Sequence, residues 1–198
     1  MAEQAATLVV PAEEIAVRVG ELGAALSRDY EGRRPVLVAV LVGSLPFLAD
    51  LVRAIDIPLE VDFLGLSRFG EGGRIRIALD TAESVEGRDV VIVEDIIDTG
   101  LTLTVLRRML GDRGAASVAT AALVDKTRRR LVDVPIEYRG FEVGDEYLIG
   151  YGLDWKGHYR NLDSLWAVLD MERLMEDPAA FHDQFYRSAS SQVEPPNC

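Results

Sequence analysis

The chain has little cysteine and no long apolar run. Its only cysteine among 198 residues is Cys198, so an internal disulfide and a cysteine-based zinc site are excluded. No stretch approaches the ~20 consecutive apolar residues of a membrane-spanning helix. The first residues also lack the basic and then apolar pattern of a secretory leader. We therefore expect a cytoplasmic protein that has no membrane partner.

Positive charge is scarce too. The 21 Lys and Arg residues are outnumbered by 33 Asp and Glu, which gives a net charge of -12. This balance disfavours a broad nucleic-acid or anionic-membrane surface, so no nucleic-acid partner is expected. A polyanionic ligand would need local cations, a metal ion or backbone amides. Two common phosphate-binding motifs, Gly-x4-Gly-Lys-Ser/Thr and Gly-x-Gly-x-x-Gly, are absent from the sequence.

Strand and helix patterns alternate over the first two-thirds of the chain. Apolar runs at 36–41, 90–93 and 117–124 predict buried strands, and residues 11–30 predict an amphipathic helix. Another helix is expected from Pro46, with Ser44 as its N-cap. The alternation predicts an α/β fold with a doubly wound, mainly parallel sheet. In such sheets ligands bind beyond the carboxyl ends of the strands.

One stretch carries most of the chemistry. The apolar run Val90–Val93 is followed by Glu94-Asp95, two isoleucines and Asp98-Thr99-Gly100-Leu101-Thr102. A small-residue loop between a strand and a helix offers backbone N–H groups that suit a phosphate. The acidic pair suits hydroxyls or Mg²⁺ instead. The combination indicates a phosphorylated sugar, although Asp98 could also serve as a helix N-cap.

This stretch resembles the signature for 5-phosphoribosyl diphosphate (PRPP) in type I phosphoribosyltransferases. Further blocks occur in the order found in hypoxanthine-guanine phosphoribosyltransferases: Leu41-Val42-Gly43-Ser44, Asp62-Phe63, Leu123-Val124-Asp125-Lys126, Gly140-Phe141-Glu142-Val143, Gly150-Tyr151-Gly152-Leu153-Asp154 and Tyr159-Arg160-Asn161-Leu162. The resemblance implies transfer of the 5-phosphoribosyl group from PRPP to N9 of hypoxanthine or guanine, with release of pyrophosphate. The implied fold is the type I fold, with a small hood built from the N-terminal and C-terminal segments.

The resemblance also suggests a domain organisation. We expect a single domain over 1–187, with a core at about 34–135 and a hood from about 8–33 and 136–187. Within the hood region, 172–186 is predicted to form one or two short helices with Leu174, Met175, Phe181 and Phe185 turned inward. Residues 188–198 are polar and are expected to be a disordered tail.

The resemblance assigns a role to each motif residue. Asp98 would be the general base at purine N7, and the residues expected to bind PRPP are Glu94, Asp95, Asp98, Thr99, Gly100, Leu101 and Thr102. Purine binding is assigned to Lys126, Tyr147, Leu148 and Asp154, and pyrophosphate binding to Val42, Gly43 and Arg160. The implied cofactor is Mg²⁺, with Glu94, Asp95 and Asp154 as ligands. The basic stretch 127–130 is predicted as a solvated turn.

Two departures from the family pattern leave alternatives open. Val42 stands where the family commonly has Lys or Arg, and the expected lid, Ser67, Arg68 and Phe69 before a glycine-rich stretch, lacks the family's tyrosine hydroxyl. A PRPP- or nucleotide-sensing regulator with weak or no catalysis is therefore the second hypothesis. A receiver-type signalling domain is disfavoured. In such domains the acidic pair normally lies on the first strand, whereas Glu94-Asp95 follows at least four predicted strands. The resemblance implies a homodimer or homotetramer, and leaves the preferred base, including xanthine, undecided.

Overall fold

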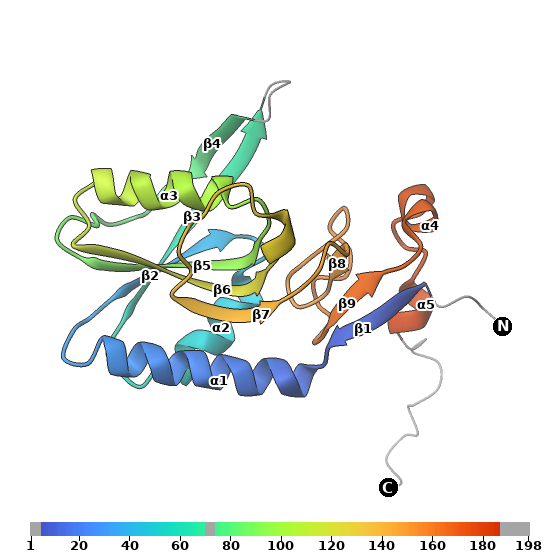
Figure 1. Ribbon diagram of the computed structural model, residues 1–198, viewed down its shortest axis with the longest axis horizontal. Helices are drawn as coiled ribbons and strands as arrows, with labels where there is room; N and C mark the ends of the chain where they lie inside the picture. Colours follow the sequence, from blue (N-terminus) through green and yellow to red (C-terminus); the bar gives the residue numbers. More distant parts are fainter. Residues whose placement is uncertain (1–4, 70–73, 187–198) are drawn as a thin grey trace, which may run out of the picture.

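The computed structural model describes residues 5–69 and 74–186. Its main layer is a six-stranded sheet in the order β4-β3-β2-β5-β6-β7 (Figure 1). All neighbouring strands run parallel except β3 and β4. The elements of this layer are β2 (Val36–Leu41), α2 (Leu45–Ala54), β3 (Glu60–Phe69), β4 (Arg74–Leu79), β5 (Asp89–Ile97), α3 (Leu101–Asp112), β6 (Ser117–Asp125), the 3-10 turn η1 (Thr127–Arg129) and β7 (Tyr138–Glu142), preceded by α1 (Ala12–Asp29). The prediction of a doubly wound, mainly parallel sheet is confirmed.

The central strands are buried on both faces, which explains their apolar sequences. β2 and β5 pair in parallel with Val38 opposite Ile92, and β5 continues the ladder to β6 with Val93 opposite Ala121. Because these strands point the same way, their carboxyl ends meet at one edge of the sheet. The loops that carry the expected site residues therefore start from that edge.

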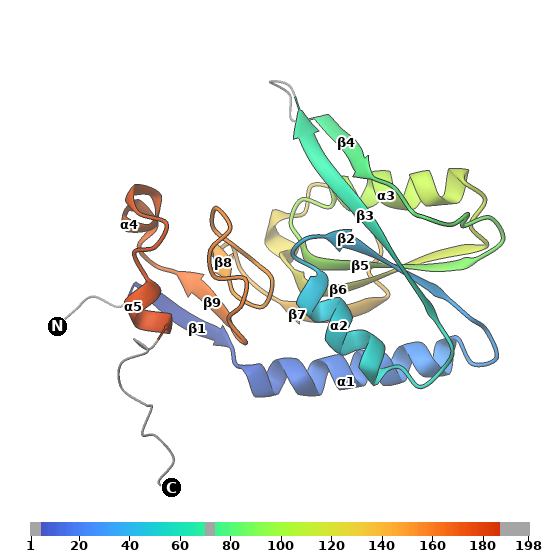
Figure 2. The same cartoon turned by 180° about the vertical axis from the view of Figure 1, so that it is seen from behind.

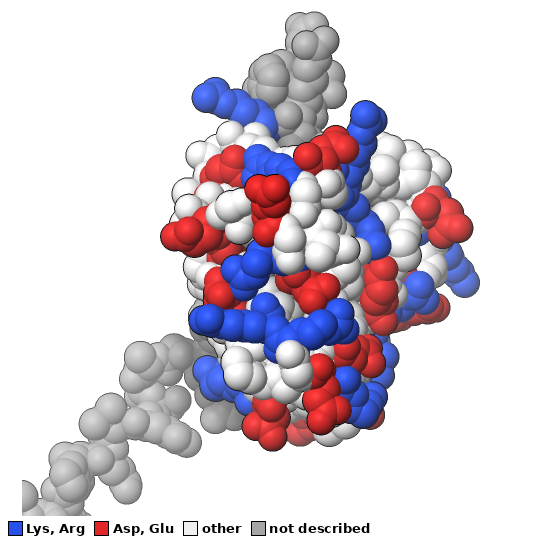
Figure 3. Space-filling model, turned by 90° about the vertical axis from the view of Figure 1, so that its left-hand side faces the viewer, with Lys and Arg blue, Asp and Glu red and all other residues white. Residues whose placement is uncertain are grey.

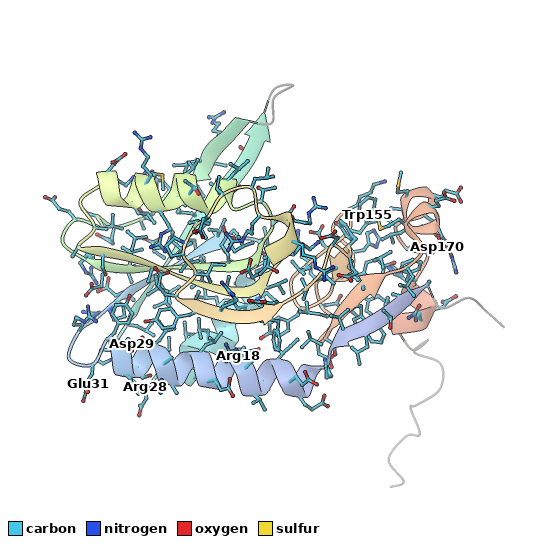
Figure 4. The ribbon with its side chains drawn as sticks, in the orientation of Figure 1. Arg18, Arg28, Asp29, Glu31, Trp155 and Asp170 are labelled. Atoms are coloured by element: carbon cyan, nitrogen blue, oxygen red, sulfur yellow. The ribbon has the colours of Figure 1, made fainter. Side chains whose placement is uncertain are left out.

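Helices cover the two faces of the sheet (Figures 1 and 2). α1 and α2 pack on one face and α3 on the other. α1 buries Ile15, Val19, Leu22 and Leu26, which recur every three or four residues. Arg18, labelled in Figure 4, ties this helix to the sheet, since its Nη2 and Nε donate to the carbonyls of Arg139 (2.6 Å) and Gly140 (3.1 Å).

A second, three-stranded sheet lies beside the first and combines both ends of the described chain (Figure 1). Its elements are β1 (Ala6–Val10), β8 (Leu148–Ile149) and β9 (Leu165–Val168), followed by α4 (Met171–Glu176) and α5 (His182–Phe185). The short helices pack on the loop between β8 and β9. Trp155, seen beside α4 in Figure 4, donates from Nε1 to the carbonyl of Leu174 (3.0 Å). The Tyr159 hydroxyl donates to the carbonyl of Pro178 (2.8 Å) and accepts from the N–H of Phe181 (3.2 Å).

Some local predictions were confirmed only in part, and others were wrong. Ser44 is the N-cap residue of α2, as expected, but its hydroxyl donates to the Val40 carbonyl (2.6 Å) and makes no capping bond. Met175 points outward, because the inward face of the short α4 is occupied by Leu174. The strand β7 lies at Tyr138–Glu142, where it pairs with β6. The expected tail at 188–198 falls outside the described residues, and the domain bounds stay a prediction.

The described surface mixes charges of both signs. On the face shown in Figure 3, Lys and Arg side chains alternate with Asp and Glu side chains. Oppositely charged side chains among the described residues form ion pairs, such as Arg113 with Asp80 at 2.6 Å. Within residues 5–69 and 74–186, no helix has both the length and the apolar character needed to cross a membrane.

Packing of the C-terminal helices can be tested with two adjacent residues. Leu174 is 0% exposed, whereas Met175 is 60% exposed. Leu174→Ala leaves a cavity and should lower the free energy of unfolding by about 2 to 3 kcal/mol. Met175→Ala should change it by no more than about 0.5 kcal/mol. Urea denaturation measures both values; equal losses would contradict the docking of α4 described above.

Candidate functional site

The loop between β5 and α3 forms the centre of the site. Contrary to expectation, Glu94 and Asp95 belong to β5 itself, since the strand continues to Ile97 and pairs with β6 beyond them. Gly100 takes a positive φ of 82° at the N-cap position of α3, and no side chain caps the helix. The alternative of Asp98 as N-cap is therefore wrong. The first N–H groups of the 12-residue helix lie at this loop, and that of Leu101 donates to Thr99 Oγ1 (3.4 Å).

A cleft of about 670 Å³ opens above the loop. It brings together residues from four segments: Val42, Gly43, Glu94, Asp95, Asp98, Thr99, Gly100, Leu101, Thr102, Asp154 and Arg160. They include every residue predicted to bind PRPP or pyrophosphate, together with Asp154. Val42 is exposed and follows a cis peptide bond from Leu41. The family commonly has a cationic side chain at this position.

The acidic pair is held close to the backbone of the loop after β2. A Cβ atom on Gly43 would lie 1.6 Å from Asp95 Oδ2, so only glycine permits this approach. Desolvation raises the pKa of Glu94 well above its ordinary value, and the neighbouring Asp95 adds to the effect. Desolvation also raises the pKa of Asp95 to about 6, against opposing contributions from backbone N–H groups and Arg160. Among the described residues neither carboxyl forms an ion pair, and desolvation has the largest effect on both pKa values.

The wall opposite the acidic pair comes from the loop after β8. Arg160 Nη2 pairs with Asp154 Oδ1 at 2.7 Å, and its Nη1 donates to the Gly152 carbonyl at 2.6 Å. The other Asp154 oxygen accepts from the N–H of Gly157 (2.7 Å). Gly152 has a φ of 98° and lies so close to Gly43 that a Cβ would be 1.9 Å from its carbonyl oxygen. These contacts place Asp154 and Arg160 across the cleft from β5.

A second cleft of about 590 Å³ adjoins the first. It gathers all four residues predicted to bind a purine: Lys126, Tyr147, Leu148 and Asp154. Lys126 is largely buried, and desolvation lowers its pKa. Its Nζ donates to the carbonyl of Glu146 (2.7 Å), and the Tyr147 hydroxyl donates to the carbonyl of Asp154 (2.8 Å). Asp95 and Asp98 line both clefts.

Sequence reasoning missed several lining residues of this second cleft. Arg129, Asp145 and Met171 all contribute to it. Arg129 belongs to the stretch predicted as a solvated turn, and no pattern distinguished it from the neighbouring Arg128. Met171 comes from α4, whose position depends on contacts distant in sequence.

The predicted lid is only partly described. Ser67, Arg68 and Phe69 are the last residues of β3 and not part of a loop, because β3 pairs with β4 up to Phe69 opposite Arg74. The glycine-rich stretch 70–73 lies outside the described residues. Of this hairpin, Leu66 lines the first cleft.

The donor set of the first cleft suits Mg²⁺. Its charged lining residues are four carboxylates, Glu94, Asp95, Asp98 and Asp154, and one guanidinium, Arg160. No group of three or more His, Cys, Asp or Glu side chains in the described part of the chain could hold a metal ion alone. Mg²⁺ is commonly held by one or two carboxylates together with substrate phosphates. The cleft therefore fits a divalent cation that shares its coordination with a polyanion.

Comparison with known proteins identifies the family. A model described as "Phosphoribosyl transferase domain" matches residues 9–156, and so the chain belongs to the phosphoribosyltransferase family. The chain is 45% identical to the hypoxanthine-guanine phosphoribosyltransferase of Streptococcus thermophilus over 154 residues, which are 76% of this chain and 86% of that protein. The corresponding Streptococcus pneumoniae enzyme is 45% identical over 159 residues, covering 78% of this chain and 88% of that one.

Solved structures agree with this placement. A hypoxanthine-guanine phosphoribosyltransferase from Bacillus anthracis superposes with a TM-score of 0.80 at 36% identity, covering 82% of this chain and 98% of that one. A hypoxanthine phosphoribosyltransferase from Trypanosoma cruzi gives 0.82 at 38% identity, covering 87% and 95%. The predicted resemblance to hypoxanthine-guanine phosphoribosyltransferases, the type I fold and the assignment as an enzyme are confirmed.

The raised pKa of Asp95 predicts that the free energy of unfolding of the ligand-free protein decreases as pH rises. Its pKa is about 6 in the folded chain and ordinarily 3.8, so protonated Asp95 stabilises the fold at low pH and this contribution is lost as pH rises from about 4 to 6. Asp95→Asn does not titrate. Without PRPP or metal, the variant should gain about 1 to 2 kcal/mol of stability over wild type at pH 7.5, and much less at pH 4.

Urea denaturation in EDTA at the two pH values measures this difference. Asp56→Asn, which changes an exposed carboxylate between α2 and β3, is the matched control and should show no comparable gain. A gain for Asp95→Asn that is the same at pH 4 and pH 7.5 would contradict the assignment of the raised pKa.

Proposed function

We propose that the chain transfers the 5-phosphoribosyl group from PRPP to N9 of hypoxanthine or guanine, giving IMP or GMP and pyrophosphate. The observation that carries this proposal is the position of Asp98, which lines both adjoining clefts. One cleft combines a helix N-terminus with acidic side chains, and the other combines a buried lysine with an aromatic ring. A sugar phosphate and a purine held in these clefts would meet beside Asp98.

The 5′-phosphate of PRPP is held by the loop from Asp98 to Thr102. The backbone N–H groups at the start of α3 face this loop, and the Thr99 and Thr102 hydroxyls add donors. Glu94 and Asp95 accept hydrogen bonds from the ribose hydroxyls. A glycine at position 100 is needed there, because its φ is positive and a Cβ would lie 2.9 Å from Arg130 Nη1.

Pyrophosphate lies between the backbone of Val42 and Gly43 on one side and Arg160 on the other. Glu94, Asp95 and Asp154 are the carboxylates that would share Mg²⁺ with PRPP, since all three line the first cleft. When bound, Mg²⁺ neutralises the phosphate oxygens and stabilises the leaving pyrophosphate. The excess of carboxylates in the cleft makes such a cation necessary for a polyanionic substrate.

Asp98 acts on the base. As N9 forms its bond to C1, the bond from C1 to the pyrophosphate oxygen breaks, and the leaving group takes its electron pair. The proton on purine N7 passes to the Asp98 carboxylate. The same carboxylate favours the positive charge that develops on the ribose.

Lys126 selects a 6-oxopurine. Its ammonium group donates to the purine O6, and the Tyr147 ring packs on the base. An amino group at position 6 cannot accept this hydrogen bond, which would leave a buried charge unpaired. The backbone at Leu148 and Asp154 reads the edge of the ring.

We also propose a single domain over 1–187 with a core at about 34–135, and a cytoplasmic homodimer or homotetramer. These assignments follow from the family resemblance. The lid role of Ser67, Arg68 and Phe69 belongs to the same proposal.

The reaction can be tested with a panel of bases. PRPP and Mg²⁺ with hypoxanthine or guanine should give IMP or GMP and pyrophosphate by chromatography, and EDTA should abolish product formation. Asp98→Asn should lower kcat by about 10² to 10³-fold while PRPP affinity changes little. Asp56→Asn should behave as wild type. PRPP binding by calorimetry without turnover on any base would favour a sensing role instead.

The role of Lys126 predicts a change in selectivity. Lys126→Gln should lower kcat/KM for hypoxanthine and guanine by about one to two orders of magnitude, because a charged hydrogen-bond donor is lost. The loss on adenine should be smaller, so the ratio of 6-oxopurine to adenine turnover falls. Arg128→Gln, which removes a nearby exposed positive charge, is the control. An unchanged ratio would refute the contact with O6.

A further inference from the structure

The turn that follows β6 is hydrogen-bonded to the strand end and loop that carry Asp98. We call the loop from Asp98 to Thr102 the phosphate loop. The N–H of Lys126 donates to the Ile97 carbonyl (2.9 Å), and the N–H of Leu131 donates to the Thr99 carbonyl (3.0 Å). The turn itself is closed by a bond from the N–H of Arg129 to the Lys126 carbonyl (2.9 Å). These bonds lie on either side of Asp98, so the backbone of Arg129 has a fixed position relative to it.

The side chain of Arg129 reaches the proposed general base. Its Nε donates to Asp98 Oδ1 at 2.5 Å. Within the described residues this is the only hydrogen bond or ion pair recorded for the Asp98 carboxylate, and Oδ2 has no protein partner. Both side chains are nearly half exposed, and an exposed pair of this kind contributes little to stability. What the contact does supply is orientation, because it holds one oxygen and leaves the other available.

A competing cation lies in the same cleft. Lys126 and Arg129 are the two cationic side chains among the described residues that line it. Lys126 is near enough to Asp98 for the carboxylate to raise its pKa and for Arg129 to lower it, although desolvation dominates. If Arg129 did not pair with Asp98, the Lys126 ammonium could form an ion pair with that carboxylate. The pairing would remove both the base and the O6 donor from the purine.

We propose that Arg129 is a positioning residue for Asp98, holding its carboxylate with one oxygen toward purine N7 and keeping it apart from Lys126. This inference rests on the proposed function. Arg129 itself takes no proton. During transfer the N7 proton passes to Asp98 Oδ2, while the bond from Arg129 to Oδ1 is kept.

Arg129→Gln tests this role, and Arg128→Gln is its matched control on the same turn. The structure records no hydrogen bond or ion pair for the described, exposed side chain of Arg128. Arg129→Gln should lower kcat for IMP formation by about 10 to 100-fold, with KM for PRPP changed by less than about threefold. Arg129→Lys should restore part of the loss. Melting temperatures of all three variants should match wild type, since the pair is exposed.

A double-mutant comparison separates positioning from an independent contribution. If Arg129 acts through Asp98, Arg129→Gln should lower kcat no further in an Asp98→Asn enzyme. Multiplied losses in the double variant, or equal kcat values for Arg129→Gln and Arg128→Gln, would overturn the proposal while leaving the proposed function intact. A wild-type chain that makes no nucleotide would instead refute the proposed function, and this proposal with it.

Discussion

The site depends on two carboxylates at the end of a parallel strand that form no ion pair with the described residues, although Arg160 lies near Asp95. Glu94 and Asp95 continue β5 beyond its apolar run, and pairing with β6 fixes them at the sheet edge. Burial of an unpaired charge is unfavourable, which is why desolvation raises the pKa of both carboxyls. A ligand that arrives with a divalent cation removes this strain. Under the proposed function, binding of the polyanion would therefore be coupled to binding of a metal ion.

The second sheet supplies the wall that the main sheet lacks. Asp154 and Arg160 lie between β8 and β9, and the Gly152 backbone packs directly against Gly43. Behind this loop, Tyr159 is fully buried and its hydroxyl bonds to the segment between α4 and α5. The C-terminal helices therefore support the residues that face the acidic pair. Substrate-binding geometry is set by both ends of the described chain.

The turn after β6 links the two clefts. Arg130 points away from solvent, and its Nε pairs with the buried Asp125 at 2.8 Å. Its Nη1 would lie 2.9 Å from a Cβ atom on Gly100. Arg129 instead pairs with Asp98. The prediction of a solvated turn over 127–130 was correct for the exposed residues Thr127, Arg128 and Arg129, and wrong for Arg130.

The main sheet, the turn at Gly100 and the family could all be predicted from the sequence. Buried strands such as Val36–Leu41 need apolar runs, and Gly100 is required by its positive φ, so both leave a local signature. The sequence could not predict which of the arginines at 128–130 is buried or paired. The three side chains are identical, and they differ only in the residues that the tertiary structure brings next to them. The ladder that brings Asp98 and Lys126 to one edge is formed by segments far apart in the chain, and such contacts have no local pattern.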